Sequence, residues 1–185
     1  MRLKKYINTD EFTDTQREYL IDAIDWKVLS EVRNTKKFLY HGCNKLIKGY
    51  KQIDRISGYV RTPLAMSKEM FEGFNNAFKD NFGWIARKGV FVISDEDFAS
   101  TFGHTYIFFP CGHNVKYVWS PKIQDINNYF NENPVDDSDT FNYDDFVKQH
   151  YISTHLKQAI TSGHEIMFDT QSYILIEKKY GNVLL

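Results

Sequence analysis

The chain has 185 residues, of which 42% are hydrophobic and 16% aromatic, and its formal net charge is −1. A chain of this length suits one domain with a buried core, and this composition excludes a generally disordered protein. A net charge so close to zero gives the whole molecule no strong field, so it says little about binding partners.

Two absences narrow the class of protein further. No segment approaches the roughly 20 consecutive apolar residues of a membrane span, and no apolar run follows the basic start of the chain to form a secretory signal. The two cysteines, Cys43 and Cys111, are typical of a reduced protein without a disulfide framework. We therefore expect a cytoplasmic protein without membrane contacts.

The first half of the chain predicts two helices and one strand. Asp10 or Thr13 can cap a helix over 10–25, and the apolar run in 37–41 predicts a strand. A basic, irregular stretch follows, up to Pro63. Ser67 is a good helix N-cap, and a Phe stripe at helical spacing predicts a helix over 67–82 whose apolar face packs in the core.

The second half of the chain predicts an alternation of short strands and helices. Expected strands are 89–94, 105–109, 115–119, 165–168 and 173–177, and expected helices are 95–102, 122–130 and 146–161. The acidic, polar stretch 131–143 predicts a loop. Because strands and helices do not alternate as regular strand–helix–strand units, the sequence indicates an α+β protein.

Charge is unevenly distributed along the chain. Between residues 36 and 68 there are eight Lys or Arg and one acid, whereas residues 125–146 hold seven acids and no Lys or Arg. Tyr40, Tyr50 and Tyr59 are interleaved with the basic residues. Such a stretch is either a solvated face or a surface that contacts a nucleic-acid backbone.

Three separated motifs carry a resemblance to a known family. They are Tyr40-His41-Gly42 at a strand end, 89–94 followed by 98–103, and 164–171, which contains His-Glu-Ile-Met-Phe-Asp. In this order they resemble the signatures of the ADP-ribosyltransferase superfamily, in the His-Tyr-Glu branch that includes the poly-ADP-ribose polymerases and diphtheria toxin. The resemblance covers roughly residues 37–177.

This resemblance implies both a fold and an activity. It implies an ADP-ribosyltransferase-like split β-sandwich over 37–185, with an N-terminal helical segment over 1–36 packed on the core. The implied reaction cleaves the nicotinamide–ribose bond of NAD, which is the substrate, and transfers ADP-ribose to a macromolecular acceptor, protein or nucleic acid. The implied protein is a monomer.

The same resemblance assigns roles to individual residues. Glu165 becomes the catalytic carboxylate, which stabilises the positive charge that develops on the ribose as the bond to nicotinamide breaks. His41 would hydrogen-bond the adenosine-side ribose, and the Gly42 backbone would pair with the nicotinamide amide without a Cβ in the way. Phe91 and Phe102, eleven residues apart, would stack on the two faces of the nicotinamide.

A second resemblance, to phage-encoded members, rests on shorter elements. Arg61-Thr62-Pro63, Phe82-Gly83 and Arg87 are similar to an Arg-x-Pro element, a helix ending in Phe-Gly and an Arg before the second motif. Arg61 would neutralise the pyrophosphate of NAD, because a guanidinium binds phosphate in a bidentate fork. A phage origin would place the protein in the host cytoplasm.

The chain also departs from the family pattern. Both stacking positions are Phe where better-known members have Tyr, which preserves stacking but removes a hydroxyl hydrogen bond. The first motif has His41 and not Arg, and Gly163 stands two residues before Glu165, where arginine-modifying members usually carry Glu or Gln. Both features disfavour an arginine acceptor. Gln171 and Tyr173 can line the acceptor side, or Tyr173 can belong to the core.

Other readings of the sequence stay open at this stage. The mirrored triplets 41–43 and 111–113 contain His and Cys that can bind zinc, although structural zinc sites prefer two or more residues between paired ligands. Cys43 can act as a nucleophile, without a supporting motif. The main alternative function is a catalytically reduced binding module that contacts a host protein or nucleic acid through the basic stretch.

Overall fold

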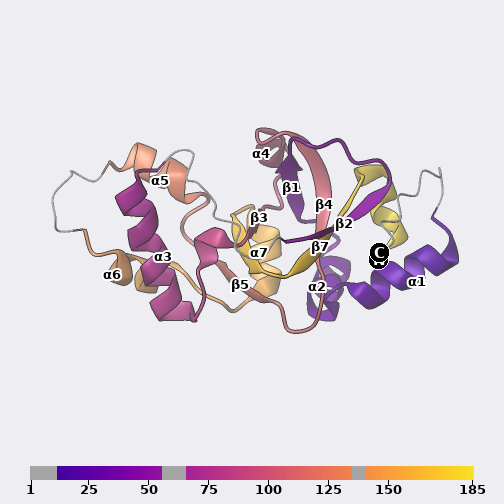
Figure 1. The fold of residues 1–185 in the computed structure, drawn as a ribbon, viewed down its shortest axis with the longest axis horizontal. Coiled ribbons are helices and arrows are strands. Elements are labelled where there is room, and N and C mark those ends of the chain that lie inside the picture. Colours follow the sequence, from indigo (N-terminus) through magenta and orange to yellow (C-terminus); the bar gives the residue numbers. More distant parts are fainter. Residues whose placement is uncertain (1–11, 56–65, 135–140) are drawn as a thin grey trace.

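The computed structural model describes residues 12–55, 66–134 and 141–185, which form a mixed α+β fold with two antiparallel sheets (Figure 1). The four-stranded sheet has the order β1-β4-β7-β2, made of Tyr40–Cys43, His104–Pro110, Ser172–Ile176 and Tyr50–Asp54. The three-stranded sheet has the order β3-β6-β5, made of Val90–Val92, Ile166–Asp169 and Lys116–Trp119. The predicted α+β class is confirmed.

The two sheets meet where β1 lies beside the end of β3. The Tyr40 amide donates to the Ile93 carbonyl at 2.7 Å, and the Ile93 amide returns a hydrogen bond to the Tyr40 carbonyl at 3.0 Å. This Tyr40–Ile93 bridge brings the second predicted motif directly beside the first. Residues about 50 positions apart in the chain therefore form adjacent walls of one region.

Two N-terminal helices pack in the main core. Helix α1 (Asp14–Ala23) begins at Thr13, whose hydroxyl accepts from the Gln16 amide, and α2 (Trp26–Thr35) begins at the buried cap Asp25. Buried Leu20 and Val32 join the same core cluster as the four-stranded sheet. The prediction for 10–25 contained α1 but not α2, and Asp10 lies outside the described residues.

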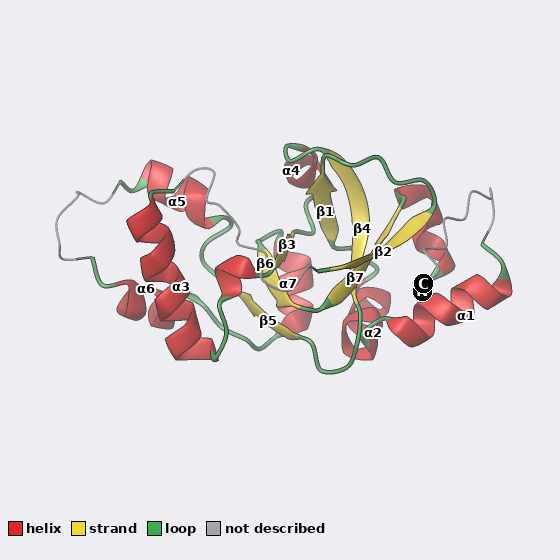
Figure 2. Cartoon of the chain, in the orientation of Figure 1, coloured by secondary structure: helices red, strands yellow, loops and turns green. Residues whose placement is uncertain are grey.

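The opposite end of the molecule holds a second core built from aromatic side chains, named here the aromatic lobe. It consists of α3 (Lys68–Phe82), α5 (Ile126–Glu132) and α6 (Tyr143–His150), which lie together in Figure 2. The Phe74 ring is central, with ring centroids 5.6 Å from Phe130 and 5.0 Å from Tyr143. The Phe stripe of α3 is thus core, as predicted, and Ser67 caps this helix through the Met70 amide.

Two predicted segments are wrong. The stretch before Pro63 contains β2, an edge strand that pairs antiparallel with β7 from Tyr50 to Asp54. The single helix expected over 146–161 is two helices, α6 and α7 (Leu156–Ser162). They separate because Ile152 pairs with Trp119 beside β5 and His155 takes a left-handed conformation with φ of 60°.

The remaining elements are short. Helix α4 (Glu96–Ser100) follows β3, the 3₁₀ helix η1 (Ala86–Lys88) precedes it, and η2 (Lys178–Val183) follows β7. Among the described residues, no helix is long and apolar enough to cross a membrane.

Candidate active site

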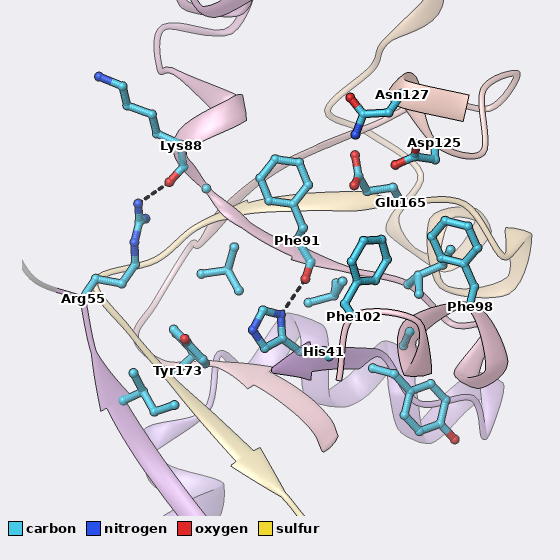
Figure 3. A pocket seen from close by; sticks show the side chains of 18 of the residues that line it. His41, Arg55, Lys88, Phe91, Phe98, Phe102, Asp125, Asn127, Glu165 and Tyr173 are labelled. Atoms are coloured by element: carbon cyan, nitrogen blue, oxygen red, sulfur yellow. Dashed lines mark hydrogen bonds between the residues drawn. The ribbon is translucent and has the colours of Figure 1, made fainter. Parts of the chain in front are cut away.

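A cavity of about 470 Å³ lies where the two sheets meet, covered on one side by α4. Its walls include five of the predicted site residues: His41, Gly42, Phe91, Phe102 and Glu165 (Figure 3). Side chains of both sheets contribute, so these residues, distant in sequence, share one space. The sixth predicted site residue, Arg61, lies outside the described residues.

His41 stands on β1 and reaches across the junction of the two sheets. Its Nδ1 lies 2.8 Å from the Phe91 carbonyl oxygen (Figure 3). Because a carbonyl only accepts, Nδ1 carries the proton, and in the neutral ring Nε2 is then an acceptor. Tyr173 of β7 packs its ring edgewise at 5.9 Å from the imidazole, and it also lines the cavity. The imidazole is therefore held in one orientation, with an acceptor suited to a ligand hydroxyl.

Gly42 is required by packing within the protein. A Cβ at this position would lie 2.3 Å from the Ala99 carbonyl oxygen and 2.8 Å from the Phe102 Cβ. Helix α4 fills the space beside Gly42 that was expected to stay open for a substrate, whereas pairing of the Gly42 backbone with nicotinamide stays a prediction. Gly42 still lines the cavity, and its absent side chain lets α4 and Phe102 close against β1.

Gly42→Ala is expected to lower the free energy of unfolding by about 1–3 kcal/mol, because overpacking a close contact forces the backbone to shift. For a chain of this length the melting temperature falls by roughly 3–10 °C. Calorimetry measures the change, with Ser100→Ala at an exposed position of α4 as the control. An unchanged melting temperature for Gly42→Ala contradicts the close packing of α4 on β1.

The two predicted stacking rings enter the cavity from different elements. Phe91 projects from β3, and the Arg87 guanidinium lies 4.9 Å from its ring centroid. Phe102 follows α4, is 56% exposed and contacts the Phe98 ring edgewise at 5.6 Å. In Figure 3 both rings point toward the middle of the cavity. One ring is thus fixed in the wall and the other stands at the rim.

Glu165 immediately precedes β6 and points into the cavity. Its amide donates to the Gln124 carbonyl at 2.8 Å, and its Oε1 lies 3.4 Å from Nη1 of Arg87. The side chains of Glu165 and Arg87 are only 17% and 6% exposed. Such a partly buried pair fixes the direction of the carboxylate and offsets its desolvation.

The neutral phenol of Tyr151 lies near the Glu165–Arg87 ion pair. Burial, and secondly the charge of Glu165, raise the pKa of Tyr151 far above its usual range, so this side chain stays protonated. Tyr151 belongs to the aromatic lobe, where its ring meets Phe78 edgewise at 4.9 Å. The apolar side of the ion pair therefore contributes no competing charge.

The end of the cavity away from Glu165 is cationic. Arg55 and Lys88 line it, and Figure 3 shows both on the opposite side from Glu165. The Arg55 guanidinium donates to the carbonyls of Thr170 and Lys88, and its Nη1 lies 4.0 Å from the Asp169 carboxylate. The cavity is thus polarised, with carboxylates at one end and cations at the other.

Sequence reasoning missed several lining residues. Arg55 belongs to the same basic stretch as Arg61, which the sequence analysis assigned to the pyrophosphate of NAD. Composition alone could not distinguish these two arginines. Asp125 and Asn127, which also line the cavity, lie at the start of the acidic segment 125–146. They belong to no sequence motif that would have indicated a functional role. Gln171, proposed beside Tyr173, contributes its carbonyl to the Arg55 amide at 2.8 Å and is not part of the cavity wall.

The mirrored His and Cys triplets do not come together. Cys43 pairs with His104 at the start of β4, whereas Cys111 follows the end of that seven-residue strand, roughly 20 Å away at the rise of a strand. Within the described ranges, no three His, Cys, Asp or Glu residues are grouped as a metal site. Burial raises the pKa of the Cys111 thiol to about 11, which makes this thiol a weak nucleophile at neutral pH.

Comparisons of the chain with protein-family models, with curated proteins and with solved structures found no match. The chemistry of the cavity is therefore inferred from its own side chains.

Proposed function

We propose that this protein is an NAD-dependent ADP-ribosyltransferase that cleaves the nicotinamide–ribose bond and transfers ADP-ribose to a macromolecular acceptor. One observation carries the proposal: three separated motifs place His41, Gly42, Phe91, Phe102 and Glu165 around a single cavity. On this proposal the two antiparallel sheets over 37–185 are an ADP-ribosyltransferase-like split β-sandwich, on which helices α1 and α2 of the N-terminal segment pack.

The polarity of the cavity suits the two halves of NAD. The flat nicotinamide ring would stack between Phe91 and Phe102, since stacking needs only ring faces. The pyrophosphate would lie toward the cationic end at Arg55 and Lys88. A volume of about 470 Å³ falls in the range of pockets that bind small molecules and cofactors.

Glu165 would act on the charge that develops during cleavage. As the bond from ribose C1′ to nicotinamide breaks, its electron pair leaves with the ring nitrogen and positive charge grows on the ribose. A carboxylate already fixed by Arg87 needs no reorganisation to stabilise that charge. The Nε2 acceptor of His41 would take a hydrogen bond from a ribose hydroxyl.

The direct test is incubation of the protein with NAD carrying a label in the adenosine half, with and without a host-cell extract. Chromatography measures free nicotinamide, and the label is followed into protein, into RNA or DNA, or into free ADP-ribose. We expect nicotinamide release that is slow alone and faster with the acceptor. The absence of both NAD binding and nicotinamide release in every extract would overturn the proposal.

His41→Ala is expected to weaken NAD binding by about tenfold, the value of one hydrogen bond near 1.4 kcal/mol. The fold should persist, although the Phe91 carbonyl loses its partner. Isothermal titration calorimetry gives the dissociation constant. His113→Ala, at an exposed position outside the cavity, is the matched control. Equal affinities of the two variants would count against the role of His41.

A binding module without catalysis is the second candidate, favoured by the cationic end of the cavity and by Phe at both stacking positions. Nucleic-acid affinity that falls steeply with salt, together with no NAD turnover, would support it. NAD turnover that depends on Glu165 would support the enzyme.

A further inference from the structure

We propose that Asp125 is the general base of the transfer step, with Asn127 orienting the attacking group; this inference rests on the proposed function. A nucleophile bearing an O–H or N–H must lose a proton when it joins ribose C1′. Glu165 faces the developing positive charge and is already paired with Arg87. A second carboxylate on the acceptor side would complete the reaction.

The chain places Asp125 beside Glu165 through the backbone. The Glu165 amide donates to the Gln124 carbonyl at 2.8 Å, and the Gln124 side-chain amide donates to the Gly163 carbonyl at 3.4 Å. The residue after Gln124 is therefore fixed relative to Glu165. Figure 3 shows the Asp125 carboxylate and the Asn127 carboxamide pointing toward Glu165 from the same side of the cavity.

The surroundings of Asp125 suit a base. It is 5% exposed, and its Oδ1 accepts from the Asn128 amide at 2.9 Å, which holds the side chain in place. No Lys, Arg or His of the described residues forms an ion pair with Asp125, in contrast with Glu165 and Arg87. Its second oxygen can therefore accept a proton at the cavity wall.

Asn127 supplies groups that an attacking hydroxyl or amide can use. It is half-buried, lines the cavity, and forms no side-chain hydrogen bond with any described residue. A carboxamide both donates and accepts hydrogen bonds, so Asn127 can hold the nucleophile in place. The proton of the nucleophile can then face Asp125.

The bond from C1′ to nicotinamide breaks, and neutral nicotinamide leaves with the electron pair. A lone pair of the acceptor oxygen or nitrogen, or of water, forms the new bond to C1′. The proton of that atom passes to the Asp125 carboxylate and is later lost to solvent.

The test compares two nucleophiles in Asp125→Asn. Asparagine caps a helix as well as aspartate does, so the substitution removes the base and keeps the cap. With water as nucleophile, formation of ADP-ribose should fall by about 100-fold or more. With sodium azide, which has no proton to lose, formation of ADP-ribosyl azide should stay within about threefold of wild type. Asp125→Ser, also a capping residue, carries the same comparison if Asp125→Asn unfolds.

The matched control is Asp95→Asn, because Asp95 caps α4 in the same way through the Phe98 amide at 2.9 Å and is not part of the cavity wall. This control should keep both rates. Unchanged ADP-ribose formation in Asp125→Asn, or equal losses with water and azide, would overturn the inference. No nicotinamide release by wild-type protein would instead overturn the proposed function itself.

Discussion

On the proposed function, Glu165→Gln is expected to lower nicotinamide release from NAD by about 10²–10³-fold, the cost of removing one fixed electrostatic group from a transition state. The neutral amide cannot stabilise the positive charge that grows on the ribose. Glutamine tests the charge more specifically than alanine does, because its side-chain oxygen still accepts a hydrogen bond from Arg87. The local packing is therefore kept. Steady-state rates of nicotinamide release, measured by chromatography, test this expectation.

The control for this variant is Glu96→Gln, which removes an exposed ion pair with Lys178 outside the cavity. It should keep the wild-type rate. Affinity for NAD should change much less than the rate in Glu165→Gln, since the carboxylate acts mainly on the transition state. Full turnover in a folded Glu165→Gln protein would show that another residue stabilises the charge.

Arg87→Met is expected to reduce both stability and turnover. It removes the Arg87 cation from beside the Glu165 carboxylate, which is 17% exposed, at a cost of about 3 kcal/mol, or roughly 6–12 °C in melting temperature. Turnover should fall by about 10–100-fold, because a misaligned carboxylate no longer faces the ribose. Thermal unfolding and nicotinamide release are measured on the same samples.

The double variant Arg87→Met with Glu165→Gln separates these two effects. A neutral pair of similar volume should regain stability to within about 1 kcal/mol of wild type, because no buried charge is left alone. It should stay inactive, since the carboxylate is gone. A purely additive loss of stability in the double variant would mean that the two side chains do not interact.

Strong local patterns made part of the fold predictable. Helix α3 has a capping Ser67, a terminal Gly83 and Phe residues at helical spacing. Each of these signals depends only on residues near it in the sequence. The short strand β3 and the capped helix α4 were predicted for the same reason. Short-range hydrogen bonds and periodic apolar residues decide these elements, so one sequence is sufficient.

Elements that depend on distant partners were not predictable. Strand β2 lies within a polar, basic stretch, and it is a strand because it pairs with β7. The break between α6 and α7 arises because Ile152 pairs with Trp119, more than 30 residues away. The same holds in the cavity: Asp125 and Asn127 belong to no motif, and contacts of Gln124 with Glu165 and Gly163, distant in sequence, bring them into it.

The Tyr40–Ile93 bridge has a mechanical consequence. The walls of the cavity belong to two different sheets, and β1 and β3 touch along a short junction that the His41–Phe91 contact reinforces. A molecule that touches both walls adds contacts between two sheets that already share a core at Phe108 and Phe168. Occupancy of the cavity and docking of the sheets are then linked equilibria, so a bound ligand stiffens the whole fold as it fills the space.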